Sequence, residues 1–164
     1  MSQVKLNDTF FLLPVTPHEV SDIILTFDNN KCLGPNSIPI YILKIANIFF
    51  SHKLSDIANK CFETGIFPDL CKIAKVIPIF KKENPLLCEN YRPISLLPIF
   101  SKIFEKLIYK RMYTFIEKHK LIYQRQFGFR TKHSTTHAII SLTESIKSQI
   151  NNGKIVGGVF IDLQ

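Results

Sequence analysis

The chain has 164 residues, 46% of them hydrophobic, and a formal net charge of +8. This composition allows one ordinary hydrophobic core and excludes a disordered polar chain, and no apolar run is long enough to span a bilayer. Residues 1–70 carry five basic and seven acidic side chains, whereas residues 71–164 carry sixteen basic and six acidic ones. We therefore expect the second part to bind a polyanion, with a merely solvated basic surface as the alternative.

The first part of the chain is predicted to be helical. A capping residue, a proline at the first helical position and a capping-box acid begin a helix at Thr16-Pro17-His18-Glu19. Apolar side chains follow at helical spacing: Val20, Ile23, Ile24 and Phe27. Residues 31–36 predict a turn, and residues 40–50 predict a buried helix. Another helix is predicted from about Ser51 to Gly65, a residue that suits a helix end.

Two extended segments follow these helices. Pro78 forbids a regular helix interior within residues 74–80, and Pro93 marks residues 91–97 as an edge strand. The segment between them, residues 81–89, is polar and predicts a turn-like loop. The two strands are therefore expected to form a hairpin.

A long amphipathic helix is predicted over residues 99–118. Its buried face is expected to comprise Ile99, Ile103, Phe104, Leu107, Ile108, Phe115 and Ile116. Its solvated face is expected to carry Lys102, Lys106, Lys110 and Arg111.

The last predicted elements are a loop, a helix and a strand. After the loop at residues 124–133, Ser134 caps a helix that Gly153 ends. The inward face of this helix is expected to comprise Ala138, Leu142 and Ile146. Residues 155–163 predict an apolar, buried strand that delivers the carboxylate of Asp162 to a site.

The cysteine spacing bears on where the protein is found. The four cysteines form no Cys-x-x-Cys pair: Cys32, Cys61, Cys71 and Cys88. This favours neither a zinc site nor a disulfide framework. The apolar run at residues 10–13 is too short for a signal-peptide core. We therefore expect reduced, mostly buried thiols in an intracellular protein, nuclear or cytoplasmic, that is not secreted and has no membrane partner.

Three sequence blocks occur in a characteristic order. They are Asn-Tyr-Arg-Pro-Ile-Ser-Leu-Leu at residues 90–97, Gln-Phe-Gly-Phe-Arg at residues 126–130 with Ser-Thr after it at 134–135, and an apolar run before Asp162. In this order and spacing they resemble the reverse transcriptases of non-long-terminal-repeat retrotransposons, LINE-like elements. The resemblance implies an α/β fold: a helical N-terminal region, a fingers β-hairpin and the first palm strand of a truncated right-hand polymerase.

No internal repeat or linker marks a second domain. We therefore expect one partial reverse transcriptase domain over residues 1–164. It comprises a helical N-terminal part at 1–73, a fingers-like part at 74–154 and the first palm strand at 155–164.

The resemblance also implies a metal site. It makes Asp162 the first catalytic carboxylate and a ligand of Mg²⁺, with the backbone carbonyl of Leu163 as a second ligand. One carboxylate cannot hold the two metal ions that polymerase chemistry needs, and no Asp-Asp occurs in the 164 residues. We expect the other ligands in downstream palm and thumb sequence, and no polymerase activity from these residues alone.

Basic residues of the predicted hairpin are candidates for binding the triphosphate of a nucleotide. These are Lys81, Lys82 and Arg92, and the related polymerases likewise have a proline after the arginine. Arginine can grip a phosphate bidentately, whereas lysine acts as a point charge. Either of the two lysines could be the functional one, and an exposed charged hairpin without a ligand is the alternative.

The Gln-Phe-Gly-Phe-Arg block predicts contact with nucleic acid. The candidates are Gln126, Phe129, Arg130 and Lys132. Aromatic rings can stack on bases and cations can bind phosphates, although core packing is equally expected for at least one of Phe127 and Phe129. His133 and His137 are spaced for a metal pair, but no third ligand accompanies them.

The implied function is that of an RNA-directed DNA polymerase. Such an enzyme extends a DNA primer on an RNA template, with deoxynucleotides and Mg²⁺. One alternative is a non-catalytic nucleic-acid-binding remnant. Another is a helical interaction module whose basic face is only solvated.

Overall fold

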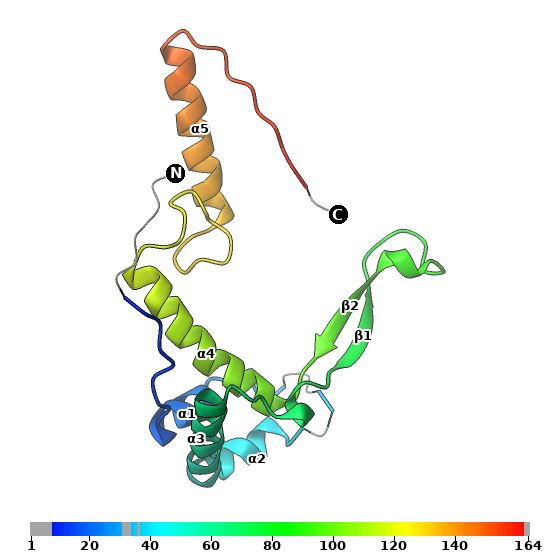
Figure 1. Cartoon of the computed structure of the whole chain (residues 1–164). Coiled ribbons are helices and arrows are strands. Elements are labelled where there is room, and N and C mark those ends of the chain that lie inside the picture. Colours follow the sequence, from blue (N-terminus) through cyan, green and yellow to red (C-terminus); the bar gives the residue numbers. More distant parts are fainter. Residues whose placement is uncertain (1–7, 31–33, 36, 163–164) are drawn as a thin grey trace. The chain divides into compact units, whose positions relative to one another are not determined.

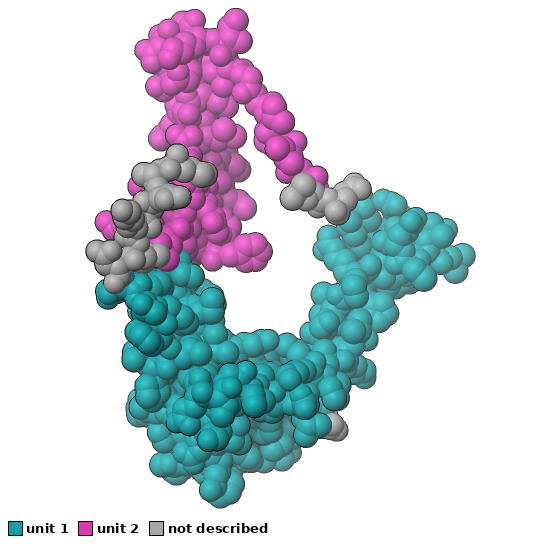
Figure 2. All heavy atoms as spheres, in the orientation of Figure 1, with its two compact units in different colours: residues 1–119 teal, residues 120–164 magenta. Residues whose placement is uncertain are grey.

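The computed structural model describes residues 8–30, 34, 35 and 37–162 (Figure 1). It divides into two compact units, residues 1–119 and residues 120–164 (Figure 2). Each unit is described by itself. In the described residues, no helix combines the length and the apolar character that crossing a membrane requires.

Helix α1 (Pro17–Leu25) begins as predicted, with Thr16 as its N-cap. The Thr16 hydroxyl accepts a hydrogen bond from the Glu19 backbone N–H at 3.2 Å. The predicted apolar stripe is confirmed, since Val20, Ile24 and Phe27 are at most 3% exposed. The Glu19 carboxylate does not complete a capping box, because it binds Arg111 instead.

Helices α2 (Ile40–Ile45) and α3 (Asn47–Thr64) meet at Ala46 rather than near residue 50. The predicted buried helix over residues 40–50 is therefore wrong. The break turns Ile45, Ile48 and Phe49 outward, where each is at least 66% exposed. Gly65 ends α3 as predicted: it has a φ of 68°, and its N–H donates to the Cys61 carbonyl.

The predicted hairpin is confirmed. Strands β1 (Lys75–Phe80) and β2 (Tyr91–Leu96) pair antiparallel, and short 3₁₀ turns precede them at Asp69–Cys71 and Cys88–Asn90. The register places Pro78 opposite Pro93.

This proline pair explains why the hairpin has only two strands. The Lys81 N–H donates to the Asn90 carbonyl at 2.8 Å, and ladder bonds join alternate pairs in an antiparallel sheet. Lys81 and Asn90 are a hydrogen-bonded pair, so the next hydrogen-bonded pair along the ladder is Ile79 with Arg92. Pro78 and Pro93 come one position further, at a pair that exchanges no hydrogen bonds. Neither proline therefore removes a ladder bond, and each leaves the outer edge of its strand without a donor. A third strand would find no N–H there to bind.

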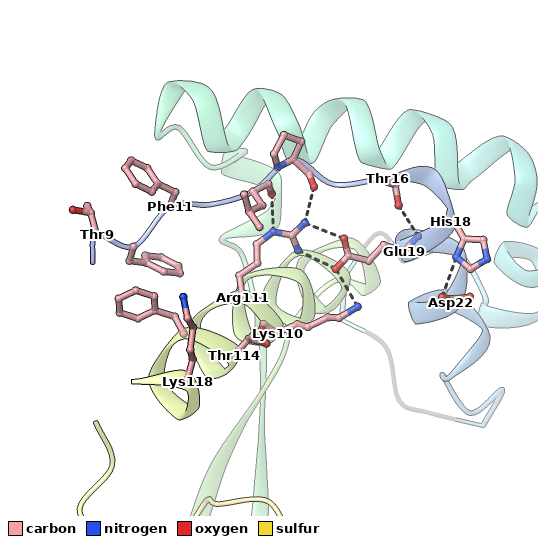
Figure 3. A pocket seen from close by; sticks show the side chains of 14 residues that line it. Thr9, Phe11, Thr16, His18, Glu19, Asp22, Lys110, Arg111, Thr114 and Lys118 are labelled. Carbon is pink, nitrogen blue, oxygen red and sulfur yellow. Dashed lines mark hydrogen bonds and ion pairs between the residues drawn. The ribbon is translucent and has the colours of Figure 1, made fainter. Parts of the chain in front are cut away.

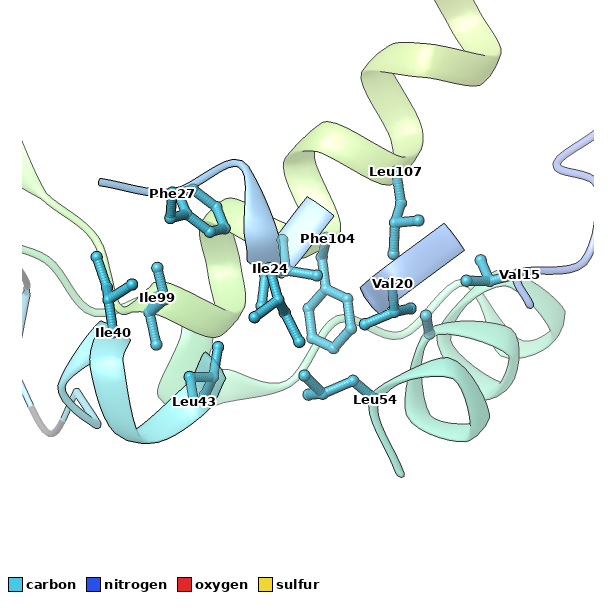
Figure 4. Close-up of a cluster of buried hydrophobic side chains, with 12 residues drawn as sticks. Val15, Val20, Ile24, Phe27, Ile40, Leu43, Leu54, Ile99, Phe104 and Leu107 are labelled. Atoms are coloured by element: carbon cyan, nitrogen blue, oxygen red, sulfur yellow. The ribbon is translucent and has the colours of Figure 1, made fainter. Parts of the chain in front are cut away.

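Helix α4 (Ile99–Lys118) has the predicted bounds and supplies a third of the core. Figure 4 shows this cluster, which also draws on α1, α2 and α3. Its members are Val15, Val20, Ile24, Phe27, Ile40, Leu43, Leu54, Ala58, Ile99, Ile103, Phe104 and Leu107. The expected burial of Ile108, Phe115 and Ile116 is only partial, because the cluster surrounds the first half of α4. Full burial of each larger side chain stabilises by about 1.5–3 kcal/mol.

An ion pair between Arg111 and Glu19 joins α4 to α1 (Figure 3). Nη1 and Nη2 of Arg111 donate to the two carboxylate oxygens at 3.0 and 2.9 Å. Nε and Nη2 also donate to the carbonyls of Leu13 and Pro14, at 2.7 and 2.9 Å. The side chain of Arg111 is only 9% exposed, so its predicted place on the solvated face is wrong.

Gly34 fastens the segment before α2 to the end of β2. Its N–H donates to the Leu97 carbonyl at 3.2 Å. A Cβ at this position would overlap the Leu96 carbonyl oxygen and lie 2.5 Å from the Leu97 carbonyl carbon. Both neighbours are backbone atoms, which cannot rotate away as a side chain can. The rest of the predicted turn at residues 31–36 lies largely outside the described residues.

The second unit contains helix α5 (Thr135–Asn151), with the predicted caps. The Ser134 hydroxyl accepts from the His137 N–H at 3.4 Å, and Gly153 has a φ of 72°. No described residue from 120 to 162 is buried. The expected inward face of α5 is therefore wrong: Leu142 is 53% exposed, and Ala138 and Ile146 are only half-buried, because no second element of this unit covers them.

The predicted buried strand at residues 155–163 is also wrong for the part that the structure describes. Residues 155–162 are irregular, and Ile155, Val159, Phe160 and Ile161 are each at least 82% exposed. A strand needs a neighbour for its N–H and C=O groups. The described residues of the second unit contain no other strand to supply one.

The described cysteines are free thiols. Cys61 and Cys71 are half-buried, but Cys88 is exposed, so the prediction of mostly buried thiols is wrong for Cys88. Burial, with Cys71 close by, raises the pKa of Cys61. Cys32 lies outside the described residues.

The close approach at Gly34 predicts a large effect of a single methyl group. Gly34→Ala should lower the free energy of unfolding by about 2 kcal/mol or more, because backbone must move to admit the Cβ. Urea unfolding followed by circular dichroism measures this. Gly157→Ala is the matched control: nothing lies within 4 Å of a Cβ there, so its change should stay within about 0.5 kcal/mol. Equal effects of the two substitutions would contradict the proposed contact.

The Arg111–Glu19 pair predicts a pH dependence of stability. Partial burial alone would raise the pKa of Glu19, but the hydrogen bonds and charge of Arg111, with those of Lys110, outweigh it and hold the pKa below its usual value. A lowered pKa in the folded state means that the charged carboxylate stabilises the fold above its unfolded pKa. This contribution is lost as the pH falls through the folded pKa.

Glu19→Gln should therefore lower the free energy of unfolding by about 2 kcal/mol at neutral pH. The difference between the wild type and this variant should shrink as the pH falls below the ordinary value of 4.5 for a glutamate. Urea unfolding of both proteins between neutral and acidic pH tests this. Asp28→Asn controls for the general effect of removing a carboxylate. A difference that is independent of pH would contradict the role given to the Glu19 charge.

Candidate nucleic-acid interface

Lys81 and Arg92 share one face of the hairpin. Successive residues of a strand alternate between faces, and residues directly opposite in an antiparallel pair point to the same face. Arg92 lies opposite Ile79, and Lys81 is two residues beyond Ile79 with its N–H still bonded in register. Lys82 lies beyond this register, in the bend after β1, and its Nζ lies 3.2 Å from the Glu83 carboxylate. The register therefore favours Lys81 over Lys82 as the partner of Arg92.

The two faces of the hairpin differ in chemistry. The face of Arg92 also carries Lys75, Ile77, Ile79, Ile94 and Leu96, by the register. The other face carries Pro78, Phe80, Tyr91 and Pro93, and its two rings lie 5.5 Å apart. The Tyr91 hydroxyl is already used, since it donates to the Pro85 carbonyl at 2.9 Å. One face is thus cationic and aliphatic, and the other is aromatic and rich in proline.

The loop of the Gln-Phe-Gly-Phe-Arg block sends its two phenylalanines in different directions. The ring of Phe127 is half-buried, with its centroid 6.0 Å from that of His133. Phe129 is 103% exposed. The Gln126 side-chain amide donates to the Gly128 carbonyl at 3.4 Å, within the turn that separates the two rings. The sequence left open whether each phenylalanine packs against the protein or is exposed. The structure packs Phe127 within the loop and exposes Phe129.

The backbone of this loop is unusual after Gly128. Phe129 and Lys132 have φ values of 59° and 63°, in the left-handed region. That region is uncommon for residues with a Cβ and costs about 1 kcal/mol or more. Arg130 is half-buried and Lys132 is exposed. The candidate residues of the block therefore lie on one irregular, basic loop ahead of α5.

The histidine pair does not form a metal site. The rings of His133 and His137 are 6.3 Å apart, and Nδ1 of His133 lies 3.0 Å from the Thr131 carbonyl oxygen. Among the described residues no three His, Cys, Asp or Glu side chains are grouped so that they could hold a metal ion.

Asp162 is exposed on the irregular segment of the second unit, and Leu163 lies outside the described residues. Divalent cations of the Mg²⁺ type need several oxygen ligands on a firm frame. A single carboxylate on a segment without strand pairing does not provide them. The described residues therefore supply one carboxylate ligand at Asp162 and do not by themselves complete a metal site.

A cavity of about 630 Å³ lies along residues 9–14, α1 and α4 in the first unit (Figure 3). Its lysines are already paired. Lys118 lies 3.3 Å from Asp8 and Lys110 lies 3.4 Å from Glu19. The His18 ring nitrogen Nδ1 lies 3.2 Å from the Asp22 carboxylate. With this balance of charges, the cavity is not built to bind a phosphate group.

Comparison with known proteins places the hairpin and the loop in a known sequence family. The family described as "Reverse transcriptase (RNA-dependent DNA polymerase)" matches residues 79–164. "Probable RNA-directed DNA polymerase from transposon BS" of Drosophila melanogaster is 31% identical over 166 residues, which cover 99% of the chain and 18% of that protein. "RNA-directed DNA polymerase from mobile element jockey" of the same species is 31% identical over 154 residues, 93% of the chain and 17% of that protein.

A third relative extends the pattern. "Probable RNA-directed DNA polymerase from transposon X-element" of Drosophila melanogaster is 30% identical over 168 residues, covering 99% of the chain and 18% of that protein. The chain thus spans less than a fifth of the length of these relatives.

Proposed function

Because the chain belongs to the reverse transcriptase (RNA-dependent DNA polymerase) family, we propose that it supplies nucleotide-binding and template-binding residues of an RNA-directed DNA polymerase. The resemblance to the enzymes of non-long-terminal-repeat retrotransposons is confirmed by the family match and by the relatives. The polymerase would extend a DNA primer on an RNA template with deoxynucleotides. One observation carries the proposal: Lys81 and Arg92 share a face of the hairpin, inside the matched residues.

The hairpin is proposed to bind the triphosphate of the incoming deoxynucleotide. Among the described residues, neither Lys81 nor Arg92 is in an ion pair, whereas Lys82 is paired with Glu83. The guanidinium of Arg92 can donate two parallel hydrogen bonds to one phosphate, and the ammonium of Lys81 adds a compact charge beside it. A polyanion with several phosphates fits two cations on one exposed face.

The loop of residues 126–132 is proposed to contact the nucleic acid. Arg130 and Lys132 would bind phosphates, and the Gln126 amide can reach phosphate or sugar oxygens. Contacts of this kind position a strand without reading its sequence, as a polymerase requires.

The metal site remains a proposal that rests on sequence. Enzymes of this family use a divalent metal ion, which activates the attacking hydroxyl and neutralises charge on the leaving phosphates. We propose Mg²⁺ as that ion, with Asp162 and the Leu163 carbonyl among its ligands. Their support is the position of Asp162 within the matched residues. No step is derived through the ion, because the described residues do not assemble its site.

We also propose an intracellular location, nuclear or cytoplasmic, supported by the free thiols of the described cysteines.

A non-catalytic nucleic-acid-binding role is the second candidate function. It is favoured by the carboxylate of Asp162, which lies exposed on an irregular segment. Such a module would bind nucleic acid but would have no need to bind a deoxynucleotide.

The hairpin proposal predicts that nucleotide affinity depends on Lys81 and Arg92 but not on Lys82. Replacing both Lys81 and Arg92 by alanine should weaken the binding of a deoxynucleoside triphosphate by about a hundred-fold, since a charged hydrogen bond from each side chain contributes about 1.5 kcal/mol. Titration of the 1–164 chain with a fluorescent deoxynucleotide measures this.

Lys82→Ala is the matched control, because it removes the same charge from a neighbouring residue that is already paired with Glu83, and it should change the affinity less than about two-fold. Equal losses of deoxynucleotide affinity for Lys81→Ala and Lys82→Ala would contradict the choice of Lys81 as the partner of Arg92. Nucleic-acid binding without any deoxynucleotide binding would favour the second candidate function.

Binding to an RNA–DNA hybrid should weaken steeply with salt, because phosphate contacts release counterions. The Arg92→Ala, Arg130→Ala double variant should reduce the slope of log affinity against log salt by about one to two units. Filter binding across a salt series measures both. Lys60→Ala is the control, since Lys60 lies near Glu63 in the acidic first part of the chain. A slope near zero for the wild type would indicate the interaction-module alternative.

A further inference from the structure

Exposed apolar side chains gather where helix α2 meets helix α3 in the first unit (Figure 1). α2 contributes Tyr41 and Ile45, and α3 contributes Ile48 and Phe49, and each of the four is at least 55% exposed. The two isoleucines stand on either side of the bend at Ala46, so the exposed side chains of the two helices are neighbours. These four residues are called the bend patch below.

The bend patch has firm support from the core. The ring of Phe49 meets that of Phe50 edge-on at a centroid distance of 5.8 Å, and the Phe50 ring lies 6.4 Å from that of Phe100 in α4. Leu43 of α2 and Leu54 of α3 are at most 5% exposed, so both helices are fixed to the core by their other faces. An apolar surface held in this way loses little conformational freedom when a partner binds to it.

Positive charge flanks the bend patch. Lys44 lies within α2, three residues after Tyr41, and Lys53 lies one turn after Phe49 in α3. Among the described residues, neither lysine takes part in an ion pair. No Asp or Glu occurs between Asp28 and Asp56. The lysines beside the patch therefore favour a partner that carries negative charge next to an apolar surface.

The charges select among the occupants that could cover such a surface. A second copy would bring its own Lys44 and Lys53 into the same two-fold interface, where like charges repel. An anionic lipid surface would meet Asp56 and Glu63, which are exposed on the same helix. An amphipathic helix with acids beside its apolar stripe avoids both conflicts, because its stripe covers the patch while its acids face the lysines.

We propose that the bend patch binds an amphipathic helix of a partner protein, with Asp or Glu residues flanking the apolar stripe of that helix. The surface uses none of the residues proposed to bind nucleotide or nucleic acid. The inference therefore stands or falls independently of the proposed function.

Fluorescence anisotropy with two designed amphipathic helical peptides tests the proposal on the 164-residue chain. Both peptides carry the same leucine stripe, flanked by Glu in one and by Lys in the other. The wild type should bind the Glu peptide about ten-fold more tightly than the Lys peptide. Replacing both Ile45 and Ile48 by Ser should weaken binding of the Glu peptide about ten-fold. Lys44→Glu combined with Lys53→Glu should reverse the preference between the two peptides.

Two matched controls place the binding at the bend patch. Leu70→Ser with Leu86→Ser removes similarly exposed apolar side chains elsewhere in the first unit and should leave the affinity unchanged. Lys60→Glu with Lys72→Glu makes the same change in net charge away from the patch and should keep the preference for the Glu peptide. Circular dichroism checks that each variant keeps its helix content.

Several outcomes would overturn the proposal. One is unchanged binding of the Glu peptide by the isoleucine variant, and another is a preference for the Glu peptide that survives the charge reversal beside the patch. Dimerisation of the wild type in size-exclusion chromatography that the isoleucine variant abolishes would assign the surface to a second copy. Binding to phosphatidylserine vesicles that this variant abolishes would assign the surface to lipid.

Discussion

The first unit depends on the buried pairing of Arg111 with Glu19. Four of the five hydrogen bonds from this guanidinium cross to α1 or to the segment before it, so one side chain holds that segment, α1 and α4 together. Removing one partner of this partly buried pair leaves the other charge without compensation, which costs about 2 kcal/mol. Because β2 leads within a few residues into α4, the orientation of α4 also governs how the hairpin is anchored.

The hairpin combines a firm anchor with two open faces. Gly34 and the Leu97 carbonyl tie its base to the core, while Pro78 and Pro93 keep further strands from its edges. The side chains of both strands are mostly exposed, and the register places Lys75 and Arg92 on the same face.

The second unit is organised differently. It has well-formed helix caps but no buried residue among those described, and its apolar side chains lie in water along α5 and residues 155–161. The basic loop of residues 126–132 belongs to this unit. The second unit therefore carries both the candidate nucleic-acid-binding residues of that loop and the exposed apolar side chains.

The sequence by itself determined the features that depend on near neighbours. The caps at Thr16 and Ser134, the end of α3 at Gly65, the hairpin and the bounds of α4 follow from local hydrogen bonding and backbone preference. The ordered sequence blocks were likewise sufficient to indicate the family. Tertiary structure alone decided which side chains are buried or meet each other. It buried the side chain of Arg111 and exposed Phe49, Leu142, Phe129 and the segment before Asp162. It also placed Lys81 in register with the hairpin and paired Lys82 with Glu83. Periodicity tells which residues share a face, but only the packing of one element on another determines whether that face is covered.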